Sequence, residues 1–106
     1  MAVKIDKKQM ADNAKDAEAF LKCLANSNRL MILCALFDGA SSRGITVGEL
    51  NEEVPLSQSA LSQHLSVLRE AGMVKTQRQS QTIYYSLADQ RVKTLLPTLY
   101  KVFCQT

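Results

Sequence analysis

The chain carries three cysteines, at positions 23, 34 and 104, and their thiols are the side chains best suited to covalent chemistry. Their number is odd, their spacings are wide and no CxxC pair occurs, which excludes a secreted disulfide scaffold and a zinc ribbon. In a reducing compartment such thiols start free. A free thiolate can attack an electrophilic sulfur, and a second thiol nearby can trap the product as a bridge.

Packing explains the three cysteines unequally well. Cys34 lies in the apolar stretch MILCALF, where a small buried thiol is a common core residue. Cys104 lies two residues from the end of the sequence, in KVFCQT, where a side chain packs poorly. We interpret Cys23 as a packing residue or a bystander thiol. The residues alone therefore leave open whether Cys104 packs or reacts.

The serines and glutamines of the stretch from 57 to 71 form a second chemically distinct group. At about 100° per residue, Leu61, Leu65 and Leu68 fall on one stripe of a helix, and short, uncharged, hydrogen-bonding side chains fall opposite. Such a face suits a helix that enters a DNA major groove, about 12 Å wide, and touches base edges. A solvated polar face is the alternative, but surface helices more often carry Lys and Glu. We therefore predict DNA contacts from Ser57, Gln58, Ser59, Ser62, Gln63, His64 and Ser66.

A polar stretch, QRQSQ, separates two segments in which side chains alternate between apolar and polar, a pattern typical of a β-hairpin with an exposed tip. Arg78 and Gln79 at this tip could reach a minor groove or the phosphate backbone of DNA, although a solvated turn would look the same. From Val74 onward the basic residues have only one acidic counterpart, Asp89. This basic half fits a surface that faces phosphates, and a solvated charged face is the plainer alternative.

The elements that would position these side chains follow from periodicity and capping. Apolar residues at three- and four-residue steps predict an amphipathic helix over 7–24, and the apolar stretch over 29–37 predicts a buried one after the capping residues NSN. DGASSRG at 38–44 predicts a turn. Thr46 is expected to cap a short helix over 47–54.

The second half of the chain adds a reading helix, a hairpin and a last helix. Ser57 is expected to cap a helix that runs to about Ala71, and Gly72 lies where a left-handed residue ends a helix. A hairpin follows over 74–86, and a last helix starts at about Asp89. Pro97 lies inside this last helix and is expected to kink or break it. The order helix, helix, helix-turn-helix, hairpin, helix predicts a mainly α, winged helix-turn-helix fold.

Length and composition place this fold in a single domain. The 106 residues are 46% apolar and 22% charged, with a formal net charge of +3, and we expect one domain over 1–106 with a disordered arm over 1–8. No apolar stretch approaches the roughly 18 residues that span a bilayer, and MAVKIDKKQM lacks the apolar region of a secretory signal. We therefore expect a cytoplasmic protein that does not bind membranes. His64 has no catalytic partner at a motif spacing and there is no Gly-rich phosphate loop, so we do not expect an enzyme.

SQSALSQHLSVLREAGMV, preceded by ANSNRLMILCAL and followed by a hairpin ending in TIYYSL, resembles the ArsR/SmtB family of bacterial winged-helix repressors. The resemblance covers residues from about 14 to 104, and its motif S-x-x-S-x-H-L-x-x-L-x-x-x-G runs from Ser59 to Gly72. It implies an obligate homodimer whose first and last helices pack across the two-fold axis. It also implies double-stranded DNA as a partner, with the reading helices in successive major grooves of an inverted-repeat operator.

Many members of this family sense metals, but their ligands are missing here. Where arsenic and cadmium sensors carry a thiolate pair, this chain has ITVGEL over 45–50, without cysteine. Zinc and nickel sensors carry Asp and His along the last helix, where this chain has Asp89 and no histidine. Because a metal site needs several converging ligands, we expect no metal and no other cofactor.

Cys34 and Cys104 match the positions at which one branch of the family carries two thiols. The resemblance implies that reactive sulfur species or oxidants link these cysteines through a disulfide or polysulfide bridge, and that operator binding then weakens. The protein would act as a repressor or as an anti-repressor. Two departures from the family pattern are Pro97 and the loop DGASSRGIT, which looks several residues longer and which we expect to be surface variation only.

Two alternatives to this hypothesis remain. In the first, the protein binds DNA as a dimer, its cysteines are inert and something else regulates it. In the second, which the Ser/Gln face and the basic half disfavour, the winged-helix fold serves as a protein-interaction module without DNA.

Overall fold

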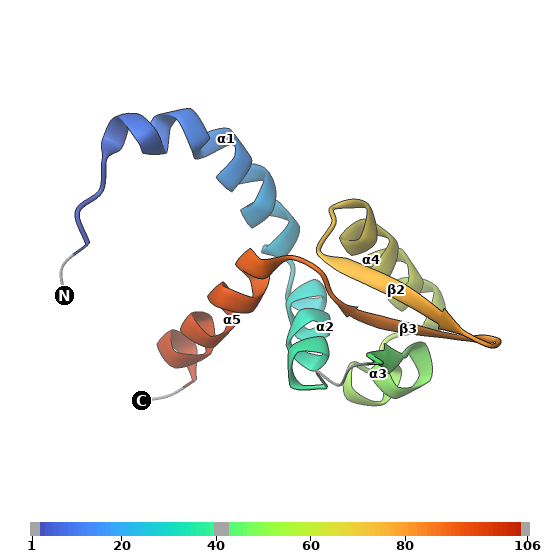
Figure 1. The fold of residues 1–106 in the computed structure, drawn as a ribbon. Coiled ribbons are helices and arrows are strands. Elements are labelled where there is room, and N and C mark those ends of the chain that lie inside the picture. The colour runs from blue at the N-terminus through green and yellow to red at the C-terminus, as the bar shows by residue number, and fades with distance from the viewer. Residues whose placement is uncertain (1–2, 40–42, 105–106) are drawn as a thin grey trace.

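The computed structural model describes residues 3–39 and 43–104, which form five helices and three strands (Figure 1). In chain order they are α1 (Lys7–Leu24), α2 (Ser27–Asp38), β1 (Ile45–Thr46), α3 (Val47–Glu53), α4 (Gln58–Glu70), β2 (Val74–Gln79), β3 (Thr82–Leu87) and α5 (Gln90–Phe103). This order confirms the predicted winged helix-turn-helix, with one short strand, β1, that was not expected.

Short polar side chains define where the helices start. Each of the five helices begins after a residue whose side chain accepts a hydrogen bond from a backbone N–H of the first turn, which satisfies a donor that the helix itself cannot. These N-cap residues are Asp6, Asn26, Thr46, Ser57 and Asp89. Gly72 follows α4 with a φ of 75°, so the predicted left-handed residue is confirmed.

The sheet has the order β1-β3-β2, and both pairings are antiparallel. β2 and β3 pair along their whole length, from Val74 opposite Leu87 to Gln79 opposite Thr82. β1 adds only the pairs of Ile45 with Tyr85 and Thr46 with Tyr84. A two-residue strand has no periodicity to detect in a sequence, which explains why it was missed.

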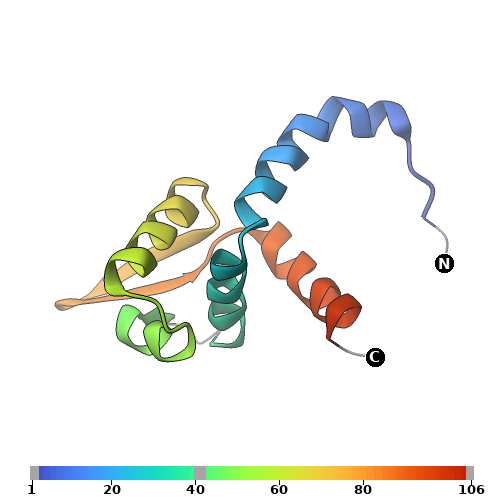
Figure 2. The same cartoon turned by 180° about the vertical axis from the view of Figure 1, so that it is seen from behind.

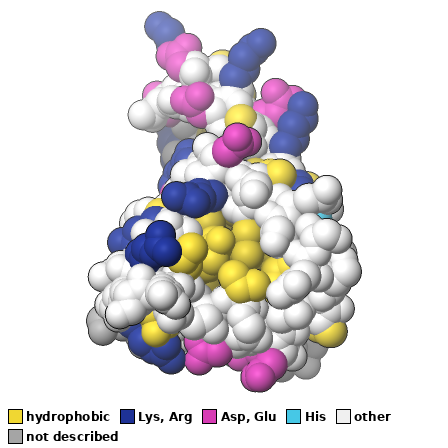
Figure 3. All heavy atoms as spheres, turned by 90° about the vertical axis from the view of Figure 1, so that its right-hand side faces the viewer, with side chains coloured by type: hydrophobic (Ala, Val, Ile, Leu, Met, Phe, Trp, Pro, Cys, Tyr) yellow, Lys and Arg dark blue, Asp and Glu magenta, His cyan; other side chains and the backbone are white. Residues whose placement is uncertain are grey.

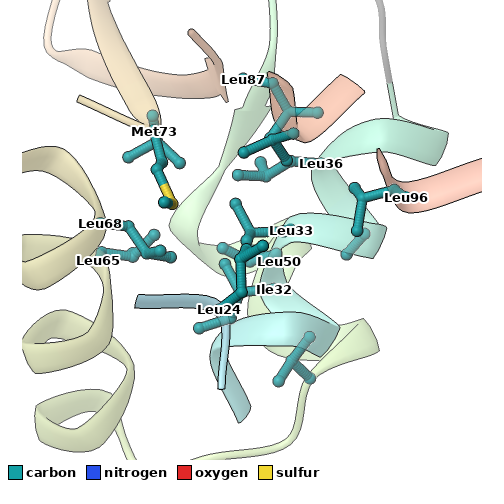
Figure 4. Packing of buried hydrophobic residues seen from close by; sticks show 14 of the residues in the cluster. Leu24, Ile32, Leu33, Leu36, Leu50, Leu65, Leu68, Met73, Leu87 and Leu96 are labelled. Carbon is teal, nitrogen blue, oxygen red and sulfur yellow. The ribbon is translucent and has the colours of Figure 1, made fainter. Parts of the chain in front are cut away.

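A single cluster of buried apolar side chains joins the helix-turn-helix to the rest of the protein (Figure 4). It draws on the last residue of α1, on α2, α3, α4 and α5, and on the ends of the hairpin strands. The largest side chains with almost no exposed surface are Ile32, Leu33, Leu50, Leu61, Leu68, Met73 and Val92. Because α2 and α4 share this core, the reading helix is held rigidly on the body of the molecule.

The two ends of the molecule are built from different elements. Figures 1 and 2 show α1 and α5 at one end, with the hairpin tip, α3 and the start of α4 at the other. No single helix among the described residues is long and apolar enough to cross a membrane; α1 and α2 meet that test only as a pair, bent by 89° where they join.

The described residues differ from two sequence-based expectations. Pro97 does not break α5, which continues to Phe103. Because proline has no N–H, the carbonyl of Lys93 loses its helical hydrogen bond. Lys93 and Pro97 are both exposed, so water can replace this bond. The helix α1 already begins at Lys7, inside the expected arm over 1–8, and residues 1–2 lie outside the described part. Of the turn expected over 38–44, residues 40–42 also lie outside it.

Candidate nucleic-acid interface and thiol pair

The turn between α3 and α4 is held by side-chain hydrogen bonds. Thr46 and Glu49 form a capping box at the start of α3: the Thr46 hydroxyl accepts from the Glu49 N–H (3.1 Å), and a Glu49 carboxylate oxygen accepts from the Thr46 N–H (3.0 Å). At the other end of α3, the Asn51 amide donates to the carbonyls of Val54 (3.1 Å) and Leu56 (2.9 Å). These contacts fix the geometry of the helix-turn-helix.

The reading helix presents the face that its sequence predicts. Leu61, Leu65 and Leu68 are buried against the core. The predicted contact residues lie on the exposed side or at the exposed N-terminal end of α4: Ser57, Gln58, Ser59, Ser62, Gln63 and Ser66. His64 is half-buried on the flank of the apolar stripe. Ser57 accepts from the Ala60 N–H (3.2 Å), so one of the predicted contact hydroxyls also caps the helix.

The hairpin tip is exposed and has its own local order. Arg78 and Gln79 are both exposed at the end of β2. The Arg78 guanidinium Nε donates to the carbonyl of Ser80 (3.2 Å), and Ser80 itself has a φ of 57°, in the left-handed region that a tight turn requires. The views of Figures 1 and 2 place this tip on the same side as the start of α4.

The surface at this end combines four kinds of side chain. Figure 3 looks onto it from the side of the hairpin tip and shows Lys and Arg side chains on one flank, uncharged polar surface on the other and Asp and Glu at the lower edge. Between the flanks the surface is hollowed, with apolar side chains at its floor. Basic groups beside an uncharged hydrogen-bonding face are the combination that contacts to phosphates and to base edges require.

The two thiols of the predicted pair lie on helices that pack together. Cys34 is half-buried on α2, where it packs against the core, and Cys104 is the exposed residue that caps the end of α5. All three cysteines are free. The structure brings Cys34 and Cys104 close enough for the charge of one to act on the other.

The surroundings of Cys34 raise the pKa of its thiol. Partial burial is the largest cause, and the negative charges of Asp38 and of the Cys104 thiolate add to it. Cys23 is not among the groups that act on Cys34; it lies half-buried on α1, and its carbonyl accepts from the Arg29 Nε (2.7 Å). Within the described residues no group of three or more His, Cys, Asp and Glu side chains is arranged to hold a metal ion.

Sequence reasoning missed two groups at this end of the molecule. The first is Asn51, which gives no sequence signal beyond its place before a turn. The second consists of Arg43, Glu49 and Tyr84, which meet through an ion pair and a ring contact. The T-x-x-E pattern of the capping box was readable in the sequence, whereas the contact of Arg43 with Tyr84 joins residues that are far apart in it.

The sequence matches characterised regulators over nearly its whole length. Residues 26–76 match the family described as "Bacterial regulatory protein, arsR family". The chain is 43% identical over 97 residues to the transcriptional activator HlyU of Vibrio cholerae, covering 92% of this chain and 86% of HlyU. It is 42% identical over 95 residues to the biofilm growth-associated repressor of Agrobacterium fabrum, covering 90% of this chain and 78% of that protein.

Solved structures of such regulators share the fold. Reduced HlyU from Vibrio cholerae aligns with a TM-score of 0.80 at 43% identity, over 92% of this chain and 99% of that one. The repressor BigR from Xylella fastidiosa aligns with a TM-score of 0.87 at 35% identity, over 96% of this chain and 100% of that one. A homodimeric winged helix-turn-helix DNA-binding domain from Mycobacterium bovis aligns with a TM-score of 0.72 at 27% identity, over 96% of this chain and 89% of that one. The protein belongs to the ArsR family of bacterial DNA-binding transcriptional regulators.

Proposed function

We propose that this protein is a cytoplasmic, homodimeric transcriptional regulator that binds an inverted-repeat operator and senses reactive sulfur species or oxidants through Cys34 and Cys104. The whole chain over 1–106 acts as one DNA-binding domain. The observation that supports the sensing part is that two free thiols, on α2 and at the end of α5, lie within electrostatic range of each other. One of the similar solved structures is of HlyU from Vibrio cholerae in its reduced form.

The two thiols have complementary parts in this chemistry. Cys104 is exposed, so it meets an external electrophile first. Its thiolate attacks the outer sulfur of an organic persulfide, RSSH, forms a protein persulfide and releases RSH. The Cys34 thiolate then attacks the inner sulfur, and hydrogen sulfide leaves. Two protein thiols and one RSSH thus give one disulfide, one RSH and one hydrogen sulfide, and hydrogen peroxide would give the same disulfide and two waters.

A bridge between Cys34 and Cys104 would change DNA binding through the dimer. It joins α2, which carries the core under the reading helix, to α5, which lies at the end of the molecule away from the hairpin tip. Apolar side chains remain exposed on α1 and α5 of the single chain, among them Leu21, Tyr100 and Phe103. If these helices form the dimer interface, the bridge alters the separation of the two reading helices, and the operator fits less well.

The test uses the reduced protein under anaerobic conditions. An organic persulfide and, separately, peroxide are added, cross-links are mapped by mass spectrometry, and affinity is measured for a duplex obtained by selection from a random pool. We expect a Cys34–Cys104 bridge and weaker binding, and we expect Cys23→Ala to respond as the wild type does. If no such bridge forms, or if the bridged protein binds DNA unchanged, the sensing proposal fails while the DNA-binding one stands.

The surroundings of Cys34 favour a second candidate function, a DNA-binding dimer with inert cysteines. A thiol whose pKa is raised is mostly protonated at neutral pH and is a slow nucleophile. The persulfide experiment separates the two, because inert thiols leave operator affinity constant. A protein-interaction module would instead show no salt-dependent binding to duplex DNA.

A further inference from the structure

Arg43, in the loop before β1, links the start of α3 to the hairpin. Its guanidinium Nη2 lies 3.2 Å from a carboxylate oxygen of Glu49, and the guanidinium carbon lies 4.9 Å from the centre of the Tyr84 ring. The Tyr84 hydroxyl and the Glu49 charge both raise the pKa of Arg43, so the guanidinium stays charged. One side chain therefore contacts the first helix of the helix-turn-helix and the strand β3 at once.

The partners of Arg43 are themselves held in place. The other Glu49 carboxylate oxygen accepts from the N–H (3.0 Å) and the hydroxyl (3.2 Å) of Thr46, and these bonds together with Arg43 lower the pKa of Glu49. The residue after Arg43 has to be a glycine: Gly44 has a φ of 87°, and a Cβ there would lie only 2.5 Å from the Tyr85 carbonyl oxygen. Arg43 thus precedes a position that only glycine fits, and it reaches a carboxylate that Thr46 already holds by two hydrogen bonds.

Tyr84 lies where the hairpin leaves the sheet. Its partner Thr46 is the last residue of β1, so from Ile83 onward toward the tip the hairpin has two strands instead of three. A two-stranded ribbon on its own is marginally stable and twists freely. The guanidinium of Arg43 stacks on the Tyr84 ring at this point. A contact here acts at the base of the two-stranded part of the hairpin, so it can influence the direction in which the tip extends.

We propose that Arg43 is a positioning residue for DNA binding, which stacks on Tyr84 and pairs with Glu49 to hold the hairpin at a set angle to the reading helix. The proposal rests on the proposed function in that the hairpin is taken to contact the operator. A hairpin ordered before binding loses less conformational freedom when it meets DNA, so binding is tighter. The loop that carries Arg43 then contributes to DNA binding, whereas the sequence suggested surface variation only.

The experiment compares the wild type with Arg43→Ala and Arg43→Lys, and it has two readouts. The first is the heteronuclear NOE of the amides of residues 79–82 in the DNA-free protein, and the second is operator affinity as a function of salt. Lysine keeps the charge but lacks the planar group that stacks and pairs in a fixed geometry. We expect lower NOE values at the tip in both variants, and affinity about 3- to 10-fold weaker with an unchanged salt slope.

Two results would overturn the proposal. One is an unchanged NOE at the tip in Arg43→Ala. The other is a salt slope that falls by about one in Arg43→Ala while Arg43→Lys binds normally, since that is the behaviour of a simple phosphate contact. Lys15→Ala, an exposed charge removed from α1, serves as the control and should leave the tip unchanged. If the wild type shows no salt-dependent DNA binding, the proposed function fails and the positioning role with it, while the NOE still shows whether Arg43 orders the hairpin.

Discussion

At the scale of single residues, the two thiols that we propose to pair differ in exposure and in the charges around them. Cys104 is exposed at the end of α5, whereas Cys34 is half-buried on α2 near Asp38. Burial and negative charge both stabilise the protonated form of a thiol, so the pKa of Cys34 lies above the ordinary value of 9.0. We therefore expect an external reagent to react first at Cys104, with Cys34 acting second.

Alkylation of the reduced protein with iodoacetamide tests this order. We expect Cys104 to be labelled first, and the Cys34 rate to keep rising with pH beyond 9.0 because the pKa of Cys34 lies above that value. Asp38→Asn removes one cause of the raised pKa and should speed Cys34 labelling at pH 8 by about twofold. Peptide mapping by mass spectrometry measures both rates. Equal rates for Cys34 and Cys104 at pH 8 would contradict the prediction.

The raised pKa of Cys34 also makes the stability of the folded protein depend on pH. Above pH 9.0 the Cys34 thiol ionises in the unfolded chain before it does in the folded one, so ionisation favours unfolding. The contribution of Cys34 to stability is complete below that pH and is lost as the pH rises through the folded-state pKa. Cys34→Ala should therefore lose less stability than the wild type between pH 8 and pH 10 in urea titrations.

Gln63 is exposed on the reading helix, and its substitution tests whether this helix recognises DNA bases. A Gln side chain can bond adenine in two places, and such a pair contributes about 1–3 kcal/mol of discrimination. Gln63→Ala should weaken binding to the selected operator by about that amount and relax the preference at one base pair in each half-site. Competition binding with single-base variants measures it. Gln90→Ala, at the exposed start of α5, should bind as the wild type does.

At the scale of elements, α5 tolerates a residue that normally ends a helix. Its start is capped by Asp89, whose carboxylate also pairs with Arg91 at 2.7 Å, and the Arg91 guanidinium lies 4.5 Å from the centre of the Phe20 ring of α1. Its buried residues, Val92 and Leu96, face the core. Packing of this apolar stripe supports the helix through the point at which one backbone hydrogen bond is missing.

Pro97→Ala should therefore stabilise the protein. It restores an N–H that can donate to the Lys93 carbonyl and removes the clash of the proline ring with that turn, for a gain of about 1–2 kcal/mol. Urea unfolding at a fixed protein concentration measures it, because the stability of a dimer depends on concentration. Thr98→Ala, the exposed neighbour, should change stability by less than about 0.5 kcal/mol. A loss of stability in Pro97→Ala would show that the proline ring packs against something.

At the scale of the whole molecule, the apolar side chains of the core are buried, whereas several at the end formed by α1 and α5 remain exposed. Phe103 is 78% exposed, Tyr100 57% and Leu21 53%. Leu21 also lines an open groove on α1 together with Met10, Ala14, Ala17, Glu18, Lys22 and Ala25. Aromatic and aliphatic side chains exposed together are typical of an interface, and a second copy of the chain is the partner that we propose.

Leu21→Glu tests this interface. The side chain is half exposed in the single chain, so the monomer should keep its fold, whereas a charge buried between two copies would separate them. We expect sedimentation at the monomer mass and operator affinity at least tenfold weaker. Ala19→Glu places the same charge on α1 outside the groove and should remain dimeric. A dimer in Leu21→Glu would place the interface elsewhere.

Interactions between residues close in the sequence determine much of the secondary structure of this protein, and these could be predicted from the sequence by itself. Helix caps such as Ser57, the left-handed Gly72 and the leucine stripe of α4 depend on neighbours within about four residues, so they could be predicted. The family motif lies in the same region, which is why the fold and the DNA-binding class followed from it.

Contacts between distant residues were decided by the tertiary structure alone. The electrostatic influence of Cys104 on Cys34, the pairing of β1 with β3 and the stacking of Arg43 on Tyr84 each depend on how separate elements pack. Pro97 shows the same limit, because its local preference to break a helix was outweighed by the packing of α5. Local preferences are worth about 1–3 kcal/mol, and the burial of an apolar face can exceed them.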